Sequence, residues 1–329
     1  MTSTEVKKTD EFRIRAGDII GITQSGNLIA FETKDEVTVF NFDRANAAIG
    51  NIQCRYTSEL SEKRLSFSRS GKYLLEKTTS SNKIKVIDLV EGRVLYQHSS
   101  SAKVNAAILI SNNQKEYLIA TLAPYQLTII DLSTLEPVFT LDSTDSFQQN
   151  YVQLEAMPDD DMVAGMGYLS GESLDSLFAF SFSKTIKEKK GLHFIRDLSD
   201  YAPVLKIGKS NRKTLLIYRD PEDSETDVDP DEFEAKPLYN FRGLYERDLN
   251  THMIQARIPI ELDNTDLRTF FLTDSSIVLG LTDGIKIISR KDVSAEGKWL
   301  QALKYTFNAI DESIILIAEN DELEIISSI

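Results

Sequence analysis

Residues 70–88, SGKYLLEKTTSSNKIKVID, contain the pattern that decides the fold. A Ser-Gly turn precedes an apolar run, a polar hairpin follows, and a second apolar run closes on Asp88. The same order occurs in residues 25–43, SGNLIAFETKDEVTVFNFD, and in residues 116–131, EYLIATLAPYQLTIID. Each copy therefore predicts two β-strands joined by a hairpin.

The motif returns about every forty to fifty residues along the chain. The sixth copy has Asp283-Gly284 between apolar runs, which is a strong hairpin signal. A sheet of this size cannot bury both faces alone, so the period predicts a ring of packed sheets. We predict an all-β fold, a single seven-bladed β-propeller domain over residues 1–329. The seven copies are expected to end at Asp43, Asp88, Asp131, Ser183, Asp248, Arg290 and Ser327.

The N-terminus offers a further strand to the last copy. Residues 11–17, EFRIRAG, alternate apolar and polar side chains, whereas the seventh copy runs out after about three strands. We expect this N-terminal strand to pair into the last blade and close the ring, with Phe12 and Ile14 facing the blade interior. Pairing of this kind removes two exposed sheet edges.

The chain resembles the WD40 or YVTN-like superfamily of β-propellers over essentially its whole length. The resemblance rests on the turns Ser25-Gly26 and Ser70-Gly71 and on the strand-closing pairs Ile87-Asp88 and Ile130-Asp131. The Gly-His and Trp-Asp dipeptides of WD40 repeats are absent, and Trp299 is not followed by Asp. The resemblance implies a docking surface on the face of the propeller that carries the loop between the second and third strands of each blade.

Composition narrows the class of function. The chain has 51 acidic and 37 basic side chains, a net charge of −14, which opposes unspecific attraction to nucleic acid or anionic lipid. Cys54 is the single cysteine and there are three histidines, so no disulfide, metal site or cofactor is expected. No segment of the sequence reads as a signal peptide or a membrane span. We expect a cytoplasmic protein without direct contact to nucleic acid or membrane.

Residues 220–234, DPEDSETDVDPDEFE, have nine carboxylates and no Lys or Arg. We expect a disordered acidic insertion over residues 220–240, between the second and third strands of the fifth blade. It either attracts a basic segment or is a solvated loop without a dedicated role. Calcium is a third interpretation, through Asp227, Asp229 and Asp231, but Glu232 stands where a calcium loop needs glycine.

The candidate partner-binding residues lie in the second-to-third strand loops. Tyr125 is a candidate aromatic anchor, and it could equally pack between blades. The basic run of residues 183–196 favours a solvated outer turn of the fourth blade. The candidates are Asp35, Glu36, Tyr125, Asp175, Asp223, Glu225, Asp227, Asp229, Asp231, Glu232, Asp283, Glu319 and Asp321.

The sequence contains no G-x-S-x-G elbow and no Walker A motif, so we expect a non-enzymatic protein-protein interaction scaffold. Its expected partner is a protein or peptide with a basic segment that binds an acidic face, within a multiprotein complex. Two alternatives stay open at this point. One is a channel-mouth enzyme of lactonase or hydrolase type, and the other is a purely structural subunit of a larger complex.

Overall fold

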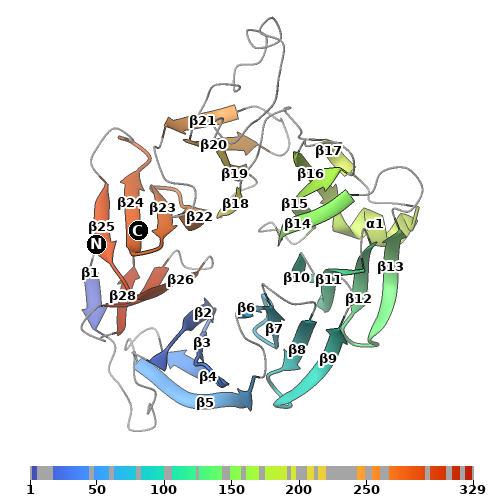
Figure 1. The fold of residues 1–329 in the computed structure, drawn as a ribbon, viewed down its shortest axis with the longest axis horizontal. Helices are drawn as coiled ribbons and strands as arrows, with labels where there is room; N and C mark the ends of the chain where they lie inside the picture. Colours follow the sequence, from blue (N-terminus) through green and yellow to red (C-terminus); the bar gives the residue numbers. More distant parts are fainter. Residues whose placement is uncertain are drawn as a thin grey trace, which may run out of the picture.

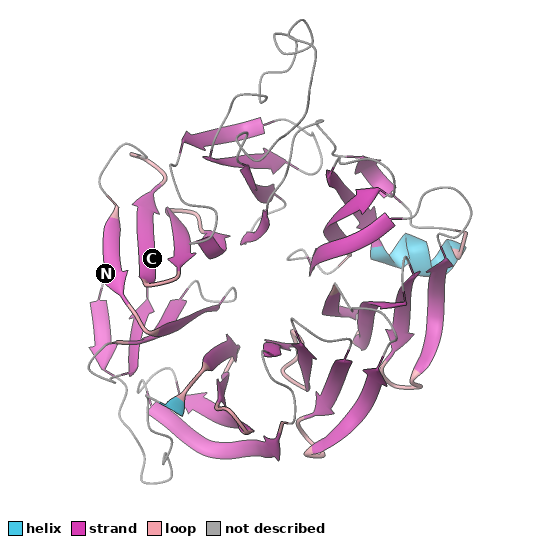
Figure 2. Ribbon diagram, in the orientation of Figure 1, coloured by secondary structure: helices cyan, strands magenta, loops and turns pink. Residues whose placement is uncertain are grey.

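The fold is a ring of antiparallel β-sheets around a central axis (Figure 1). The structure is a computed structural model that describes residues 2–5, 18–43, 48–58, 63–78, 83–99, 106–123, 126–142, 149–156, 161–169, 175–190, 194–197, 206–210, 214–219, 243–248, 254–259, 267–292, 297–308, 313–318 and 323–327. Strands dominate these residues, which include one α-helix, α1 (Phe182–Glu188) (Figure 2). The predicted all-β propeller is confirmed.

The first four sheets along the chain each contain four consecutive strands. The first sheet contains β2 (Gly21–Ser25), β3 (Leu28–Glu32), β4 (Glu36–Asp43) and β5 (Ala48–Thr57). The second contains β6 (Lys63–Phe67), β7 (Tyr73–Thr78), β8 (Lys83–Asp88) and β9 (Arg93–Ser99). The third contains β10 (Ala107–Asn112), β11 (Lys115–Ala123), β12 (Gln126–Asp131) and β13 (Glu136–Asp142). The fourth contains β14 (Gln149–Ala156), β15 (Met162–Leu169), β16 (Asp175–Ser181) and β17 (Phe194–Asp197).

The next eight strands form one continuous sheet in two halves. One half contains β18 (Lys206–Ser210), β19 (Thr214–Arg219), β20 (Gly243–Asp248) and β21 (Ile254–Pro259). The other contains β22 (Leu267–Leu272), β23 (Ser276–Leu281), β24 (Gly284–Ser289) and β25 (Lys298–Gln301). Parallel pairing of β18 with β22, Lys209 with Phe271 and Ser210 with Leu272, joins the halves. The structure thus has five separate four-stranded sheets and one eight-stranded sheet, where the sequence predicts seven separate blades.

The last sheet contains strands from both ends of the sequence, β26 (Lys304–Asn308), β27 (Ser313–Ile317), β28 (Leu323–Ser327) and β1 (Thr2–Glu5). β1 and β28 lie side by side and antiparallel (Figure 1). The predicted closing strand, residues 11–17 with Phe12 and Ile14, lies outside the described residues. Strand β1 is not predictable from the sequence pattern, because its strand-forming threonines do not alternate with apolar side chains.

The core lies between neighbouring sheets. In β3, Ile29 and Phe31 pack with Ile315 of the last sheet, whereas Ala30 faces the other way and packs with Leu74 of the second sheet. Successive side chains of a strand point to opposite faces, so both faces of the first sheet are buried. This two-sided burial explains the continuous apolar runs of the repeat.

Strand pairing corrects the alignment of the repeats. The first residue of a second strand that pairs with the third strand lies opposite the residue that closes the third strand, as Tyr73 lies opposite Asp88 and Tyr117 opposite Asp131. By this criterion Ser181 and Ser289 close their strands, in place of the predicted Ser183 and Arg290. The equivalent residue of the first sheet is Asn41, although β4 itself ends at Asp43 as predicted. Asp248, opposite Thr214, agrees with the sequence. The closing residue is therefore defined by pairing and not by an acidic side chain.

Helix α1 replaces the hairpin turn that the sequence favours for the basic run. Ser181 caps its N-terminus by accepting a hydrogen bond from the Lys184 amide at 3.4 Å. Asp161 accepts from the Ser183 amide at 2.9 Å. Phe182 and Thr185 are buried, and the Phe182 ring lies 5.0 Å from that of Tyr117 in the third sheet. The capping and the apolar contact both favour a helical turn here.

Candidate functional site

The two faces of the ring carry different loops. We call upper face the one that carries the loops between second and third strands, such as residues 33–35 and 282–283, and the links between sheets. Its loops are tied to neighbouring links: the Ser58 amide donates to the Asp35 carbonyl at 2.9 Å. The Tyr305 hydroxyl donates to the Leu281 carbonyl of the preceding sheet at 2.8 Å. The lower face carries the remaining turns, including residues 89–92 and 132–135.

The structure places three of the predicted site residues on the upper face with described side chains. Asp35 and Asp283 are exposed in the turns of the first sheet and of the β22–β25 half. Glu36 is half-buried at the start of β4. Asp175 starts β16, and only its backbone is described. The other predicted residues lie outside the described residues: Tyr125, Asp223, Glu225, Asp227, Asp229, Asp231, Glu232, Glu319 and Asp321.

Charges of both signs lie on the described part of the upper face. Glu36 contacts Arg55 at 3.2 Å and accepts a hydrogen bond from the Thr38 hydroxyl at 2.8 Å. Lys34, next to Asp35, and Arg268 are exposed. An ion pair such as Glu36–Arg55 reduces the negative potential at its position. These side chains alone do not make the acidic face that the sequence predicts.

A buried polar cluster lies between the first and second sheets, beneath the upper face. The Ser58 hydroxyl donates to Glu76, whose side chain is fully buried. Burial raises the pKa of Tyr56, and the nearby Glu76 carboxylate raises it further. Ser58 follows β5 of the first sheet and Glu76 lies in β7 of the second, so this buried hydrogen bond joins the two sheets.

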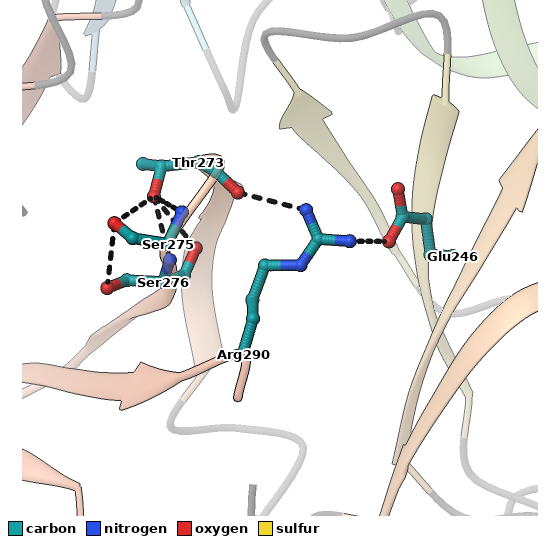
Figure 3. Close-up of polar contacts among 5 residues, drawn as sticks. All are labelled: Glu246, Thr273, Ser275, Ser276 and Arg290. Atoms are coloured by element: carbon teal, nitrogen blue, oxygen red, sulfur yellow. Dashed lines mark hydrogen bonds and ion pairs between the residues drawn. The ribbon is translucent and has the colours of Figure 1, made fainter. Parts of the chain in front are cut away.

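A second buried contact joins the halves of the eight-stranded sheet on the lower side. Figure 3 shows the Arg290 guanidinium between the Thr273 carbonyl, at 3.2 Å, and the Glu246 carboxylate, at 2.5 Å. The Glu246 side chain has no exposed surface, and that of Arg290 is 19% exposed. The other carboxylate oxygen of Glu246 is buried without a hydrogen-bond partner.

Repeat positions show what this ion pair replaces. Arg290 follows the strand-closing residue, where the other sheets have Leu89, Leu132 and Phe182, all buried. Glu246 lies two residues before the closing residue of its strand, and the equivalent residues of the first three sheets are Val39, Val86 and Ile129. These apolar residues share clusters across each junction, Val39 with Leu89, Val86 with Leu132 and Ile129 with Phe182. The ion pair therefore stands where three other junctions have an apolar contact.

Sequence reasoning missed this pair because it aligned Arg290 itself with the strand-closing residues. In the register set by strand pairing, Arg290 falls one position later, among buried apolar side chains. A charged residue at such a position signals a buried partner. The signal was present in the sequence, but only strand pairing reveals it.

The described residues show no group of three or more His, Cys, Asp or Glu side chains that could hold a metal ion. Within the same residues, no helix is long and apolar enough to cross a membrane. Cys54 is buried, and burial raises the pKa of its thiol. Its thiol is thus disfavoured as a nucleophile.

Comparison with known proteins supports the fold. No protein-family model and no curated protein matches the sequence. A solved structure of hydrazine synthase from Kuenenia stuttgartiensis has a TM-score of 0.62 and 10% identity, covering 97% of this chain and 99% of that chain. The β-propeller domain of Cps50 (Swd1) from Myceliophteria thermophila has a TM-score of 0.59 and 13% identity, covering 100% of both chains. At such identities the likeness shows the fold alone, and the predicted resemblance to β-propellers is confirmed at that level.

Proposed function

We propose that the chain is a seven-bladed β-propeller in which the eight-stranded sheet represents two blades. Each half repeats the four-strand order of the separate sheets, and two parallel residue pairs join them. Pairing of β1 with β28 supports a ring that is closed by the two ends of the sequence.

We propose further that this ring is a non-enzymatic platform for protein-protein interaction in a multiprotein complex. The observation that carries the proposal is the run of buried clusters between sheets, which holds the upper-face loops on a rigid frame. A rigid frame lowers the cost of ordering a binding surface, while loops supply specificity. No described group of side chains favours the alternative of a channel-mouth enzyme.

The proposed partner carries a basic segment that binds on the upper face. Support comes from the net charge of −14 and from the nine carboxylates in residues 220–234, which lie in the sequence between Arg219 and Gly243, the paired residues that end β19 and begin β20 on that face. Asp35 and Asp283 add exposed carboxylates there. Such a charge distribution steers a basic segment towards the face. The free, buried Cys54 is compatible with the cytoplasmic location that we propose.

Affinity purification tests this proposal. The wild-type chain and a variant with residues 220–234 replaced by a Gly/Ser linker are used at low and moderate salt. We expect partner recovery at low salt to fall in the variant, because the variant lacks the carboxylates that attract the basic segment. Low salt is used because a salt concentration of 0.1 M already screens exposed charges beyond about 10 Å. A control that changes the lower-face carboxylates Glu91, Glu136 and Glu188 to Gln should keep the recovery. Unchanged recovery and unchanged salt dependence in the linker variant would contradict the role of this segment.

A further inference from the structure

The lower face presents large apolar side chains on neighbouring sheets. Val90, in the turn between β8 and β9, is 68% exposed, and Leu135, in the turn between β12 and β13, is 40% exposed. Val94, in β9, is 46% exposed. Single exposed apolar residues are ordinary, so exposure alone does not identify a site. The conformation of the second turn supplies a further observation.

Leu135 has a backbone conformation that favours glycine. Its φ is 62°, and the equivalent residue of the preceding sheet is Gly92, also with φ of 62°. Both turns follow a strand-closing aspartate whose carboxylate accepts hydrogen bonds from the turn: Asp88 from the Val90 amide at 2.9 Å, and Asp131 from the Ser133 amide at 2.8 Å. Leucine is strained where glycine is not. The chain thus keeps an exposed leucine at a position where glycine fits better.

Backbone with positive φ recurs in this region. Among the described residues, the non-glycine residues with positive φ are Asn113, Gln114, Leu135 and Lys189. The first three lie in lower-face turns of the third sheet, and Lys189 ends α1 on the lower face of the fourth sheet. Asn113 lies in a tight turn and Lys189 caps a helix, where this conformation is common, whereas the bulky Leu135 is strained by it. Backbone strain of that kind often marks a functional site.

Basic side chains lie on the lower side of the same sheets and of the fourth sheet. Arg93 and Lys115 are exposed near the two turns, and α1 and its C-terminus add exposed Lys184, Lys187 and Lys189. The carboxylates on this part of the surface include exposed Glu91, Glu136 and Glu188, half-buried Glu116 and Asp161, and buried Asp88 and Asp131. The exposed charge here is positive on a chain whose net charge is −14.

We propose that the lower face of the second, third and fourth sheets is a second binding surface, for an acidic partner segment that carries apolar side chains. The apolar side chains of the segment contact Val90 and Leu135, and its carboxylates face Arg93 and the lysines of α1. Charge complementarity identifies this class of partner, because a basic segment would meet like charge here. This surface lies on the other side of the ring from the upper face, so the proposal does not depend on the function proposed for the upper face.

The test is the binding of a fluorescein-labelled peptide, DEELDEFDEELDE, to the full chain, measured by fluorescence anisotropy at low salt. The control peptide has Ser in place of Leu and Phe. We expect saturable binding of the first peptide and a dissociation constant about tenfold higher in the Val90→Ser/Leu135→Gly variant. The matched control Ile20→Ser changes a 47% exposed apolar residue of the upper face and should bind like wild type.

The Leu135→Gly change should not prevent folding, because glycine adopts a φ of 62° without strain, so a loss of peptide binding would report on the surface itself. Leu135→Gly alone should therefore keep or raise the melting temperature while it weakens binding. The proposal is overturned by absence of saturable binding, by equal binding of the variant and wild type, or by loss of binding in Ile20→Ser. Self-association of the full chain that Leu135→Gly abolishes would also overturn it, since the occupant would then be a second copy.

Discussion

Replacing Glu246 and Arg290 singly and together tests how the two halves of the eight-stranded sheet are held together. Arg290→Leu introduces leucine, the residue found at the equivalent position 132 of the third sheet, but leaves the fully buried Glu246 carboxylate without its cation. Removing one partner of a buried ion pair lowers the free energy of unfolding by about 3–5 kcal/mol. Glu246→Val should cost less, about 1–2 kcal/mol, because the 19% exposed Arg290 side chain can turn towards water.

The double variant Glu246→Val/Arg290→Leu recreates the apolar contact seen for Val86 and Leu132. Its stability should match or exceed that of wild type, because well-packed apolar residues replace a buried ion pair without loss in many proteins. The cycle should therefore give a coupling free energy of about 4–7 kcal/mol between the two positions, because the double variant recovers the losses of both single variants.

Equilibrium urea unfolding of the four proteins, followed by tryptophan fluorescence and circular dichroism, provides the assay. Arg257→Leu, at an exposed arginine of β21, is the matched control and should change stability by less than about 0.5 kcal/mol. The reasoning is refuted if Arg290→Leu is no worse than this control. It is equally refuted if the double variant is as unstable as Arg290→Leu.

Burial alone would raise the pKa of Asp131, but hydrogen bonds from Ser133 and Lys115 more than offset it, so the pKa lies below its ordinary value. The ionised carboxylate therefore stabilises the fold above the unfolded pKa of about 3.9, and this contribution is lost as pH falls through the folded pKa. Asp131→Asn should flatten the acid side of a plot of the free energy of unfolding against pH. An unchanged acid side would contradict the role of Asp131. Burial of Cys54 and the raised pKa of its thiol predict slow reaction with a thiol reagent in native buffer and full reaction in denaturant. Rapid native labelling would contradict this. Deleting residues 1–5 should expose the edge of β28 and increase aggregation on heating, as measured by light scattering. A deletion variant that stays as monodisperse as wild type would speak against the pairing.

The fold class was predictable because its signal repeats. Alternation of apolar runs and turns appears in several copies, so an error in one copy leaves the period intact. The same local pattern could not set the register, because Ser181 and Ser289 close strands without an acidic side chain. Pairing of strands far apart in sequence decides that question, as it does for β1 and β28.

The candidate site was predictable only in its location. Loop order along the chain places Asp35 and Asp283 on one face, and the structure agrees. The partners of these loops depend on contacts between distant segments, such as Glu36 with Arg55. Similarly, the strain at Leu135 becomes visible only when its backbone angle is compared with that of Gly92.

A structure of the chain bound to the protein that copurifies with it at low salt tests the central claim most directly. We predict seven four-stranded blades around one axis, with a basic segment of the partner seated on the upper face near Asp35 and Asp283. A partner that contacts only the outer strands, or a small molecule held at the channel mouth with no partner on the upper face, would contradict the account.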